Sequence, residues 1–164
     1  MFNMFADAKV DHLAIAVIDL EKAIEYYTKN LGFDLIEQRI TSGVKTAMKS
    51  AVLGGLSTGF TIVLLEGIGK ESQVSRFVEK FGPGVQHAAF LVEDLEKVAV
   101  ELAGRGVEFS TDIIRGPNLY QLFTKREENS GMMFEYIQRL EQKDGFEETN
   151  IQRLFESLEQ SDHF

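Results

Sequence analysis

Cysteine is absent from the 164 residues, and histidine and proline are scarce, with three and two copies. Without cysteine the chain forms no disulfide, no thiolate metal site and no iron–sulfur cluster, and it has no cysteine nucleophile. Any bound metal must therefore be held by nitrogen and oxygen ligands. The three imidazoles belong to His12, His87 and His163, and we assign no role to His163, which lies in the C-terminal tail.

Basic residues and long apolar runs are also in short supply. The sequence has 17 Lys and Arg residues against 26 Asp and Glu residues, a formal net charge of −9. Such a field repels phosphate backbones and anionic lipid headgroups, so we expect no nucleic-acid partner and no membrane partner. No apolar run approaches the roughly 18 residues of a membrane span, and the first ten residues do not resemble a signal peptide. These features, with 44% apolar residues, predict a cytoplasmic protein with one globular domain.

The sequence contains an internal repeat. Residues 11–33 align with residues 86–107, and the matched histidines are 87 − 12 = 75 positions apart. At this offset His12 pairs with His87, and the tetrapeptide Asp-Leu-Glu-Lys recurs at 19–22 and 94–97. Each copy opens with an apolar run of strand length and continues into a helix that an Asp can cap. The repeat therefore predicts two copies of one supersecondary unit.

Three strand-like segments follow the helix in each copy, so each half is predicted to be a βαβββ module. These strands are predicted at 33–41, 46–53 and 60–65 in the first half and at 107–114, 119–124 and 132–139 in the second. A connecting helix is expected at 73–80, and a C-terminal helix is expected behind a Thr149/Asn150 cap.

The predicted fold class is α+β, with two tandem βαβββ modules that pair into one mixed-sheet, barrel-like domain and a C-terminal helix. One module alone leaves a sheet face and an edge uncovered, which a second module can cover. We predict a single domain at 8–140, with the first module at about 8–66, a connector at 67–85 and the second module at about 86–140. The C-terminal helix and tail take residues 141–164.

Pairing of the modules would bring His12 and His87 together, and two converging imidazoles favour a metal site. Glu135, an acidic residue inside an otherwise apolar strand, is the expected third ligand, because an inward charge is costly unless it is coordinated or paired. The alternatives are two structural histidines and an outward-facing Glu135. The last strand of the first half, GFTIVLL, offers no fourth ligand, although Glu66 follows closely. Two His and one Glu are typical of non-haem Fe(II) sites, with zinc or manganese left open.

Four ordered motifs carry a family resemblance: GPGVQHAAF at 82–90, LYQLFTK at 119–125, FEYIQR at 134–139 and GFEETNIQRLF at 145–155. With the βαβββ repeat, they resemble the vicinal oxygen chelate superfamily, and most closely the C-terminal catalytic half of the 4-hydroxyphenylpyruvate dioxygenases and hydroxymandelate synthases. The resemblance implies that His12, His87 and Glu135 bind Fe(II). It also implies a substrate pocket formed by Ser50, Gln73, Gln86, Gln121, Phe123 and Asn150.

Other readings of these pocket residues remain open. Strand alternation would point Gln86 away from His87 and into solvent, and Asn150 could serve only as a helix cap. The sequence also departs from the resembled family. Met133 and Ile151 stand where that family has phenylalanines, which implies a wider pocket, and Glu66 replaces a polar amide.

The resemblance implies a non-haem Fe(II) dioxygenase that takes a small 2-oxo acid and O₂ and couples oxidative decarboxylation to hydroxylation. Two alternatives stay open. One is a glyoxalase- or epimerase-like lyase or isomerase, which normally needs a fourth protein ligand to its divalent metal. The other is a non-catalytic small-molecule-binding protein of the same fold. A homodimer is compatible with each of these functions.

Overall fold

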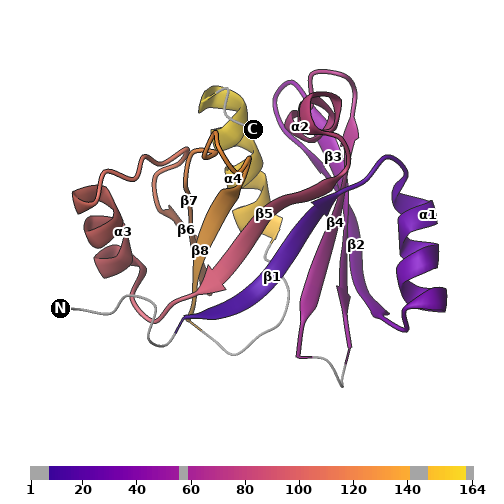
Figure 1. Ribbon diagram of the computed structural model, residues 1–164, viewed down its shortest axis with the longest axis horizontal. Helices are drawn as coiled ribbons and strands as arrows, with labels where there is room; N and C mark the ends of the chain where they lie inside the picture. Colours follow the sequence, from indigo (N-terminus) through magenta and orange to yellow (C-terminus); the bar gives the residue numbers. More distant parts are fainter. Residues whose placement is uncertain (1–7, 56–58, 141–147, 162–164) are drawn as a thin grey trace.

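The computed structural model describes residues 8–55, 59–140 and 148–161. Its strands form an eight-stranded mixed sheet in the order β2-β3-β4-β1-β5-β8-β7-β6 (Figure 1). The strands are β1 (Lys9–Ala16), β2 (Asp34–Ser42), β3 (Ala47–Gly54), β4 (Thr61–Ile68), β5 (Gly84–Leu91), β6 (Ile114–Arg115), β7 (Leu119–Phe123) and β8 (Met133–Arg139). The helices are α1 (Leu20–Glu25), the π-helix η1 (Tyr26–Asn30), α2 (Gln73–Phe81), α3 (Leu95–Gly104) and α4 (Glu148–Ser161). The predicted α+β class and the connecting helix α2 are confirmed.

The two modules form the two halves of this sheet and are related by an approximate twofold axis. β1 and β5 are the antiparallel central pair, and each has a parallel partner from its own module, β4 for β1 and β8 for β5. An antiparallel meander completes each half, β2-β3-β4 on one side and β8-β7-β6 on the other. The sheet curls into a half-barrel whose edges are β2 and β6 (Figure 1).

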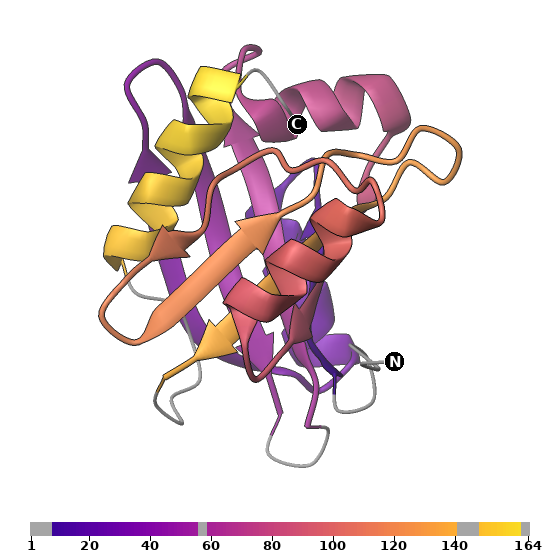
Figure 2. The same cartoon turned by 90° about the vertical axis from the view of Figure 1, so that its left-hand side faces the viewer.

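Helices cover both sides of the curled sheet. α1 and α3 lie at opposite ends of the molecule, each against its own half (Figure 1). α4 contacts both β2 and β6, so it lies across the open side between the two sheet edges (Figure 2). None of the helices in the described ranges has the length and apolar character needed to span a membrane.

The two module helices begin with the same cap. Asp19 Oδ1 accepts a hydrogen bond from Lys22 N at 3.0 Å, and Asp94 Oδ1 accepts one from Lys97 N at 3.1 Å. A side-chain acceptor at this position satisfies an amide that has no partner within the helix. The repeated Asp-Leu-Glu-Lys tetrapeptide therefore has a structural role as a helix start.

The predicted strand at 107–114 is wrong for most of its length, because only its last residue belongs to a strand, β6. The segment does reach β7, where Ser110 N donates to Phe123 O at 2.8 Å. Phe123 N, however, donates to the hydroxyl of Thr111 at 3.2 Å rather than to a backbone carbonyl. A side chain that takes a place in the ladder interrupts regular pairing.

Two helices have features that the sequence pattern does not predict. The first is α-helical only to Glu25 and continues as the π-helix η1, where Thr28 Oγ1 donates to Ile24 O at 2.8 Å. The described part of the C-terminal helix α4 starts at Glu148, so Thr149 and Asn150, the predicted cap, both lie within the helix and that prediction is wrong. The Asn150 side chain is fully buried and donates to Leu119 O on β7.

Candidate metal centre

β1 and β5 carry the two histidines to equivalent places. In their antiparallel register His12 faces Ala89, and His87 faces Ala14. Ala14 and Ala89 also occupy equivalent positions in the repeat. The twofold axis that relates the modules therefore relates the His12–Ala89 pair to the His87–Ala14 pair. Both alanines are fully buried, so each imidazole lies opposite a small buried side chain.

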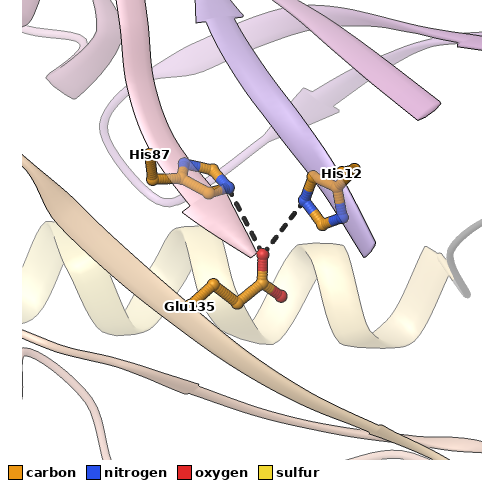
Figure 3. Close-up of side chains that lie close together, drawn as sticks. All are labelled: His12, His87 and Glu135. Carbon is orange, nitrogen blue, oxygen red and sulfur yellow. Dashed lines mark ion pairs between the residues drawn. The ribbon is translucent and has the colours of Figure 1, made fainter. Parts of the chain in front are cut away.

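Glu135 completes a buried cluster with the two histidines. It lies on β8, next to β5, where it pairs with Ala89. Its Oε2 atom is 3.1 Å from His12 Nε2 and 3.3 Å from His87 Nε2 (Figure 3). Donor atoms of the three residues all lie within 4.8 Å of one another. Glu135 is 1% exposed, so the alternative of an outward-facing carboxylate is wrong.

A bulge residue precedes each histidine. The β1–β5 register shifts at Asp11 and at Gln86, which are repeat equivalents. Asp11 Oδ1 lies 2.8 Å from His12 Nδ1, and Gln86 Oε1 contacts His87 Nδ1. An acceptor at Nδ1 favours the tautomer that carries hydrogen there and leaves the Nε2 lone pair for a metal. Both imidazoles therefore present Nε2 to Glu135.

Because of its bulge, Gln86 does not point into solvent, so the alternative based on strand alternation is wrong. Gln86 is 3% exposed and lies against His87, because the extra residue re-aims its side chain. Asp11 has the same position in the first module, yet sequence reasoning did not identify it as part of the site. The available signal was its alignment with Gln86 in the repeat.

Asp11 is held from the other module. Arg139, the last residue of β8, donates from Nε to Asp11 Oδ2 and from Nη2 to Asp11 Oδ1, each at 2.9 Å. Two parallel charge-assisted hydrogen bonds of this kind fix the orientation of a carboxylate. Asp11 is thereby fixed between Arg139 and the imidazole of His12.

Burial and charge oppose each other at the three clustered groups. Burial lowers the pKa of His12, but the carboxylates of Glu135 and Asp11 outweigh burial and raise this pKa to about 9. Burial favours the neutral form of Glu135, yet the two imidazoles hold its pKa well below the usual range. Burial lowers the pKa of His87, whose Nδ1 faces a neutral amide. At neutral pH without metal, a proton therefore resides on His12 beside an ionised Glu135.

A chain of amides fixes the second oxygen of Glu135. Gln121 Nε2 donates to Glu135 Oε1 at 2.8 Å, and Asn150 Nδ2 donates to Gln121 Oε1 at 3.1 Å and to Leu119 O at 2.9 Å. Glu135 Oε1 is thus occupied, and Oε2 is left to face the imidazoles. The same chain links α4 to the cluster.

The module-one counterpart of Glu135 is Val63. Val63 on β4 pairs with Ala14 as Glu135 on β8 pairs with Ala89. Glu66, the alternative fourth ligand, is engaged elsewhere: its Oε2 accepts from Leu20 N at 2.7 Å, and its Oε1 lies 2.9 Å from Lys49 Nζ. The described side chains that could serve as metal ligands in this cluster are therefore three in number.

Glu66 has an equivalent in the second module, Gln138, which makes the same contact with a helix start. Gln138 Oε1 accepts a hydrogen bond from Leu95 N at 2.9 Å, as Glu66 does from Leu20 N. Each side chain therefore completes the start of its module's helix, α1 or α3. Glu66 is thus engaged at the start of α1 and is not part of the His, His and Glu cluster.

A cavity with mainly apolar walls adjoins the cluster. Among the predicted pocket residues, those that line it are Ser50, Gln73, Gln86, Gln121 and Phe123. Its apolar walls include Met48, Val52, Leu65, Val74, Ile151 and Leu158. The ring of Phe123 packs edge-on against His87 at 5.4 Å between centroids. An ion pair between Glu37 and Arg39, which the sequence did not predict, also lines the cavity.

Known solved structures resemble this chain over most of its length. A 4-hydroxymandelate synthase variant from Streptomyces coelicolor superposes with a TM-score of 0.84 and 26% identity, covering 95% of this chain and 56% of that one. Methylmalonyl-CoA epimerase from Mycobacterium tuberculosis superposes with a TM-score of 0.68 and 28% identity, covering 79% of this chain and 87% of that one. Similar folds thus occur in a synthase and in an epimerase.

Sequence comparison finds a dioxygenase relative and a matching family model. A 4-hydroxyphenylpyruvate dioxygenase from Aspergillus fumigatus is 28% identical over 86% of this chain, but the match takes in 45% of that protein. The chain thus spans about half the length of this curated relative. The family model for the glyoxalase/bleomycin resistance protein/dioxygenase superfamily matches residues 9–136. The chain, with its two βαβββ modules and central His, His and Glu cluster, therefore belongs to the glyoxalase/bleomycin resistance protein/dioxygenase superfamily.

Proposed function

We propose that this protein is a non-haem Fe(II) dioxygenase that acts on a 2-oxo acid. The observation that carries the proposal is that the two symmetry-related positions beside the histidines hold different residues, only one of which can bind a metal. Glu135 occupies one of them and Val63 the other, so the chain offers two His and one Glu and leaves the rest of the coordination sphere open. This ligand set is the facial triad of Fe(II) oxygenases.

The spacing of the donor atoms suits a divalent metal. Ligands about 2.1 Å from an ion and at right angles lie about 3 Å apart. The distances from Glu135 Oε2 to the two Nε2 atoms, 3.1 and 3.3 Å, match this spacing. A buried carboxylate with a single free oxygen and two imidazoles oriented through Nδ1 would hold the ion.

The residues of the chain have separable tasks in this proposal. Bound Fe(II) would supply activation of O₂ and open positions for the 2-oxo carboxylate of the substrate. Gln121 keeps Glu135 oriented, and the apolar walls exclude water from the reacting groups. Ser50, Gln73 and Gln86 are polar groups along the cavity that can orient the substrate tail.

The tail of the substrate would extend along the cavity away from the cluster. Phe123 provides an aromatic face beside His87, whereas Met133 and Ile151 provide flexible and branched aliphatic surfaces. Aliphatic walls accept a range of apolar groups and discriminate weakly between them. We therefore include aliphatic and aromatic 2-oxo acids, 4-hydroxyphenylpyruvate among them, as test substrates.

The decisive experiment measures metal content and O₂ uptake. Protein without a histidine tag is loaded anaerobically with Fe(II) and then mixed with each 2-oxo acid and O₂. The proposal predicts one iron per chain and uptake that depends on the 2-oxo acid, and loss of both in His12→Ala. Glu101→Ala, on α3 at an exposed ion pair with Arg105, is the matched control that retains both. Uptake retained in His12→Ala would refute the assignment.

A second candidate is an epimerase-like enzyme that moves a proton next to a metal-polarised carbonyl. The likeness to methylmalonyl-CoA epimerase, which covers 87% of that chain, favours this candidate. Val63 opposes it, because such enzymes normally use a fourth protein ligand. Exchange of the α-proton of methylmalonyl-CoA in D₂O, with no O₂ uptake on any 2-oxo acid, would favour the epimerase. Metal binding without either reaction would favour the non-catalytic small-molecule-binding protein. Light scattering would separately establish whether two chains associate.

A further inference from the structure

We propose that Asp11 and Arg139 form a positioning pair that orients His12 and tunes it differently from His87. The inference rests on the metal site proposed above, because it concerns how that site holds its ion. It adds two residues that the ligand set does not contain. It also assigns different properties to two histidines that the repeat makes equivalent.

The contacts of Asp11 carry the inference. Its Oδ1 atom lies 2.8 Å from His12 Nδ1, and both of its oxygens accept from the Arg139 guanidinium at 2.9 Å. Asp11 is 10% exposed and Arg139 is 17% exposed in their side chains. Bidentate hydrogen bonds to a partly buried guanidinium hold the carboxylate in one orientation, and the carboxylate in turn holds the ring.

The ion pair also connects two strands that do not pair with each other. Asp11 lies on β1 and Arg139 on β8, and β5 lies between these strands in the sheet. β1 carries His12 and β8 carries Glu135, so the pair braces the two strands that supply these ligands. A shift of β8 relative to β1 would change the 3.1 Å separation of His12 Nε2 and Glu135 Oε2.

The second module provides an internal comparison. Gln86 stands at the bulge position equivalent to Asp11, and it presents a neutral amide oxygen to His87 Nδ1. A carboxylate at this position makes an imidazole a stronger donor to a metal than an amide does. The two nitrogen ligands are therefore unequal, with His12 the stronger donor.

Cobalt(II) binding tests the pair without reference to catalysis. The full chain is titrated with Co(II), and affinity and the visible absorption of bound Co(II) are recorded for wild type and variants. Asp11→Ala should weaken binding by about 10- to 100-fold, the usual loss when a partner of a ligating histidine is removed. Asp11→Asn keeps an acceptor for Nδ1 but loses the charge, so it should bind more tightly than Asp11→Ala and still shift the absorption bands.

Matched variants separate positioning from a general loss of stability. Arg139→Gln keeps Asp11 but removes the bidentate clamp, and it should weaken Co(II) binding in the same direction. Glu101→Ala breaks an exposed ion pair between Glu101 of α3 and Arg105, which follows this helix, and should change neither affinity nor spectrum. Wild-type affinity and spectrum in folded Asp11→Ala, or an unchanged spectrum in Asp11→Asn, would overturn the inference.

The result is distinguishable from failure of the proposed function. If wild-type protein does not bind Co(II), the proposed metal site fails, and this inference fails with it. If wild type binds Co(II) but Asp11→Ala binds equally well, the positioning role alone is refuted. If the predicted losses occur in protein with no dioxygenase activity, the positioning role stands and the proposed reaction falls.

Discussion

Val63 lies opposite Ala14 in the first module, just as Glu135 lies opposite Ala89 in the second. The twofold symmetry of the fold thus provides a place for a fourth ligand, and the sequence fills it with an apolar side chain. Val63 is buried and lines the cavity. This single position separates a three-ligand site from a four-ligand site in an otherwise unchanged fold.

Val63→Glu should convert the site to four protein ligands. We expect at least about tenfold tighter Zn(II) binding, since structural zinc sites are four-coordinate, and loss of O₂ uptake dependent on a 2-oxo acid. Without metal, the variant should unfold at a lower temperature, because two buried carboxylates repel each other. Titration calorimetry measures the Zn(II) affinity, scanning calorimetry of the metal-free protein measures the unfolding temperature, and an oxygen electrode measures the uptake.

Val63→Ala is the control for this substitution. It removes apolar contacts without adding a ligand, so it should destabilise the protein by about 1–2 kcal/mol and leave Zn(II) affinity within about twofold. Equal affinities in Val63→Glu and Val63→Ala would show that the side chain does not reach the metal.

Metal binding should depend on pH through His12. Because the pKa of His12 is raised to about 9 without metal, an incoming ion must displace its proton at neutral pH. Affinity should therefore rise about tenfold per pH unit between pH 7 and 9, with release of about one proton per ion. Calorimetric titrations in buffers of different ionisation enthalpy count the proton, and a proton count near zero at pH 7 would contradict the assignment.

The same pKa determines how the stability of the metal-free protein varies with pH. The folded-state pKa of His12 lies above its usual value of 6.5. This histidine therefore contributes its full stabilisation below about pH 6.5, and the contribution is lost as pH rises to about 9. Denaturant unfolding of metal-free protein should show this decline, whereas Zn(II)-loaded protein should not. A decline of the same size in both forms would assign the effect to other groups.

Gly116→Ala should disturb the attachment of α4. A Cβ atom at Gly116 would lie 1.6 Å from Asn150 Oδ1, so one of the two must move. We expect a loss of about 1–3 kcal/mol in the free energy of unfolding and weaker metal binding, because Asn150 holds Gln121, which holds Glu135. Gly104→Ala, in α3, where an added Cβ would meet nothing within 4 Å beyond its chain neighbours and the backbone of its own helix, is the control and should be close to neutral. Similar effects in the two variants would contradict this explanation.

Glu159→Ala should loosen the far end of α4. The Glu159 carboxylate accepts hydrogen bonds from Val44 N at 3.0 Å and from Thr46 N at 2.8 Å, in the turn between β2 and β3. Without these bonds, amides of α4 should exchange faster with deuterium, and the KM for the substrate should rise more than kcat falls. Gln160→Ala, at the neighbouring exposed position, should leave exchange unchanged. Protection of α4 equal to that of wild type would show that this anchor is dispensable.

Much of the site was predictable because the repeat encodes symmetry. The offset that pairs His12 with His87 identifies equivalent positions on the first strand of each module, and two related modules bring such positions together about their axis. Glu135 was recognisable as an acidic residue in an apolar strand, since burial of an unpaired charge is unfavourable. The α+β class and helix α2 followed from periodicity and from glycine and proline at the turns.

Other features depended on contacts between segments distant in the sequence. The predicted strand at 107–114 is mostly irregular because the Thr111 hydroxyl takes a place in the ladder, which hydrophobic pattern cannot reveal. The role of Asp11 required the bulge and the approach of Arg139 from 128 residues away. Asn150 resembled a helix cap, yet its amide extends to Gln121 once α4 lies across the sheet edges.

The sequence by itself determined the two modules, the approximate axis between them and the three side chains that meet there, because each follows from local pattern and its repetition. Only the tertiary structure decided which residues support those side chains and which position stays without a ligand. The two bulges re-aim Asp11 and Gln86, and the strand register places Val63 opposite Ala14. Register and bulges are set by packing across the whole sheet, so the physical information that specifies them is not local to any segment.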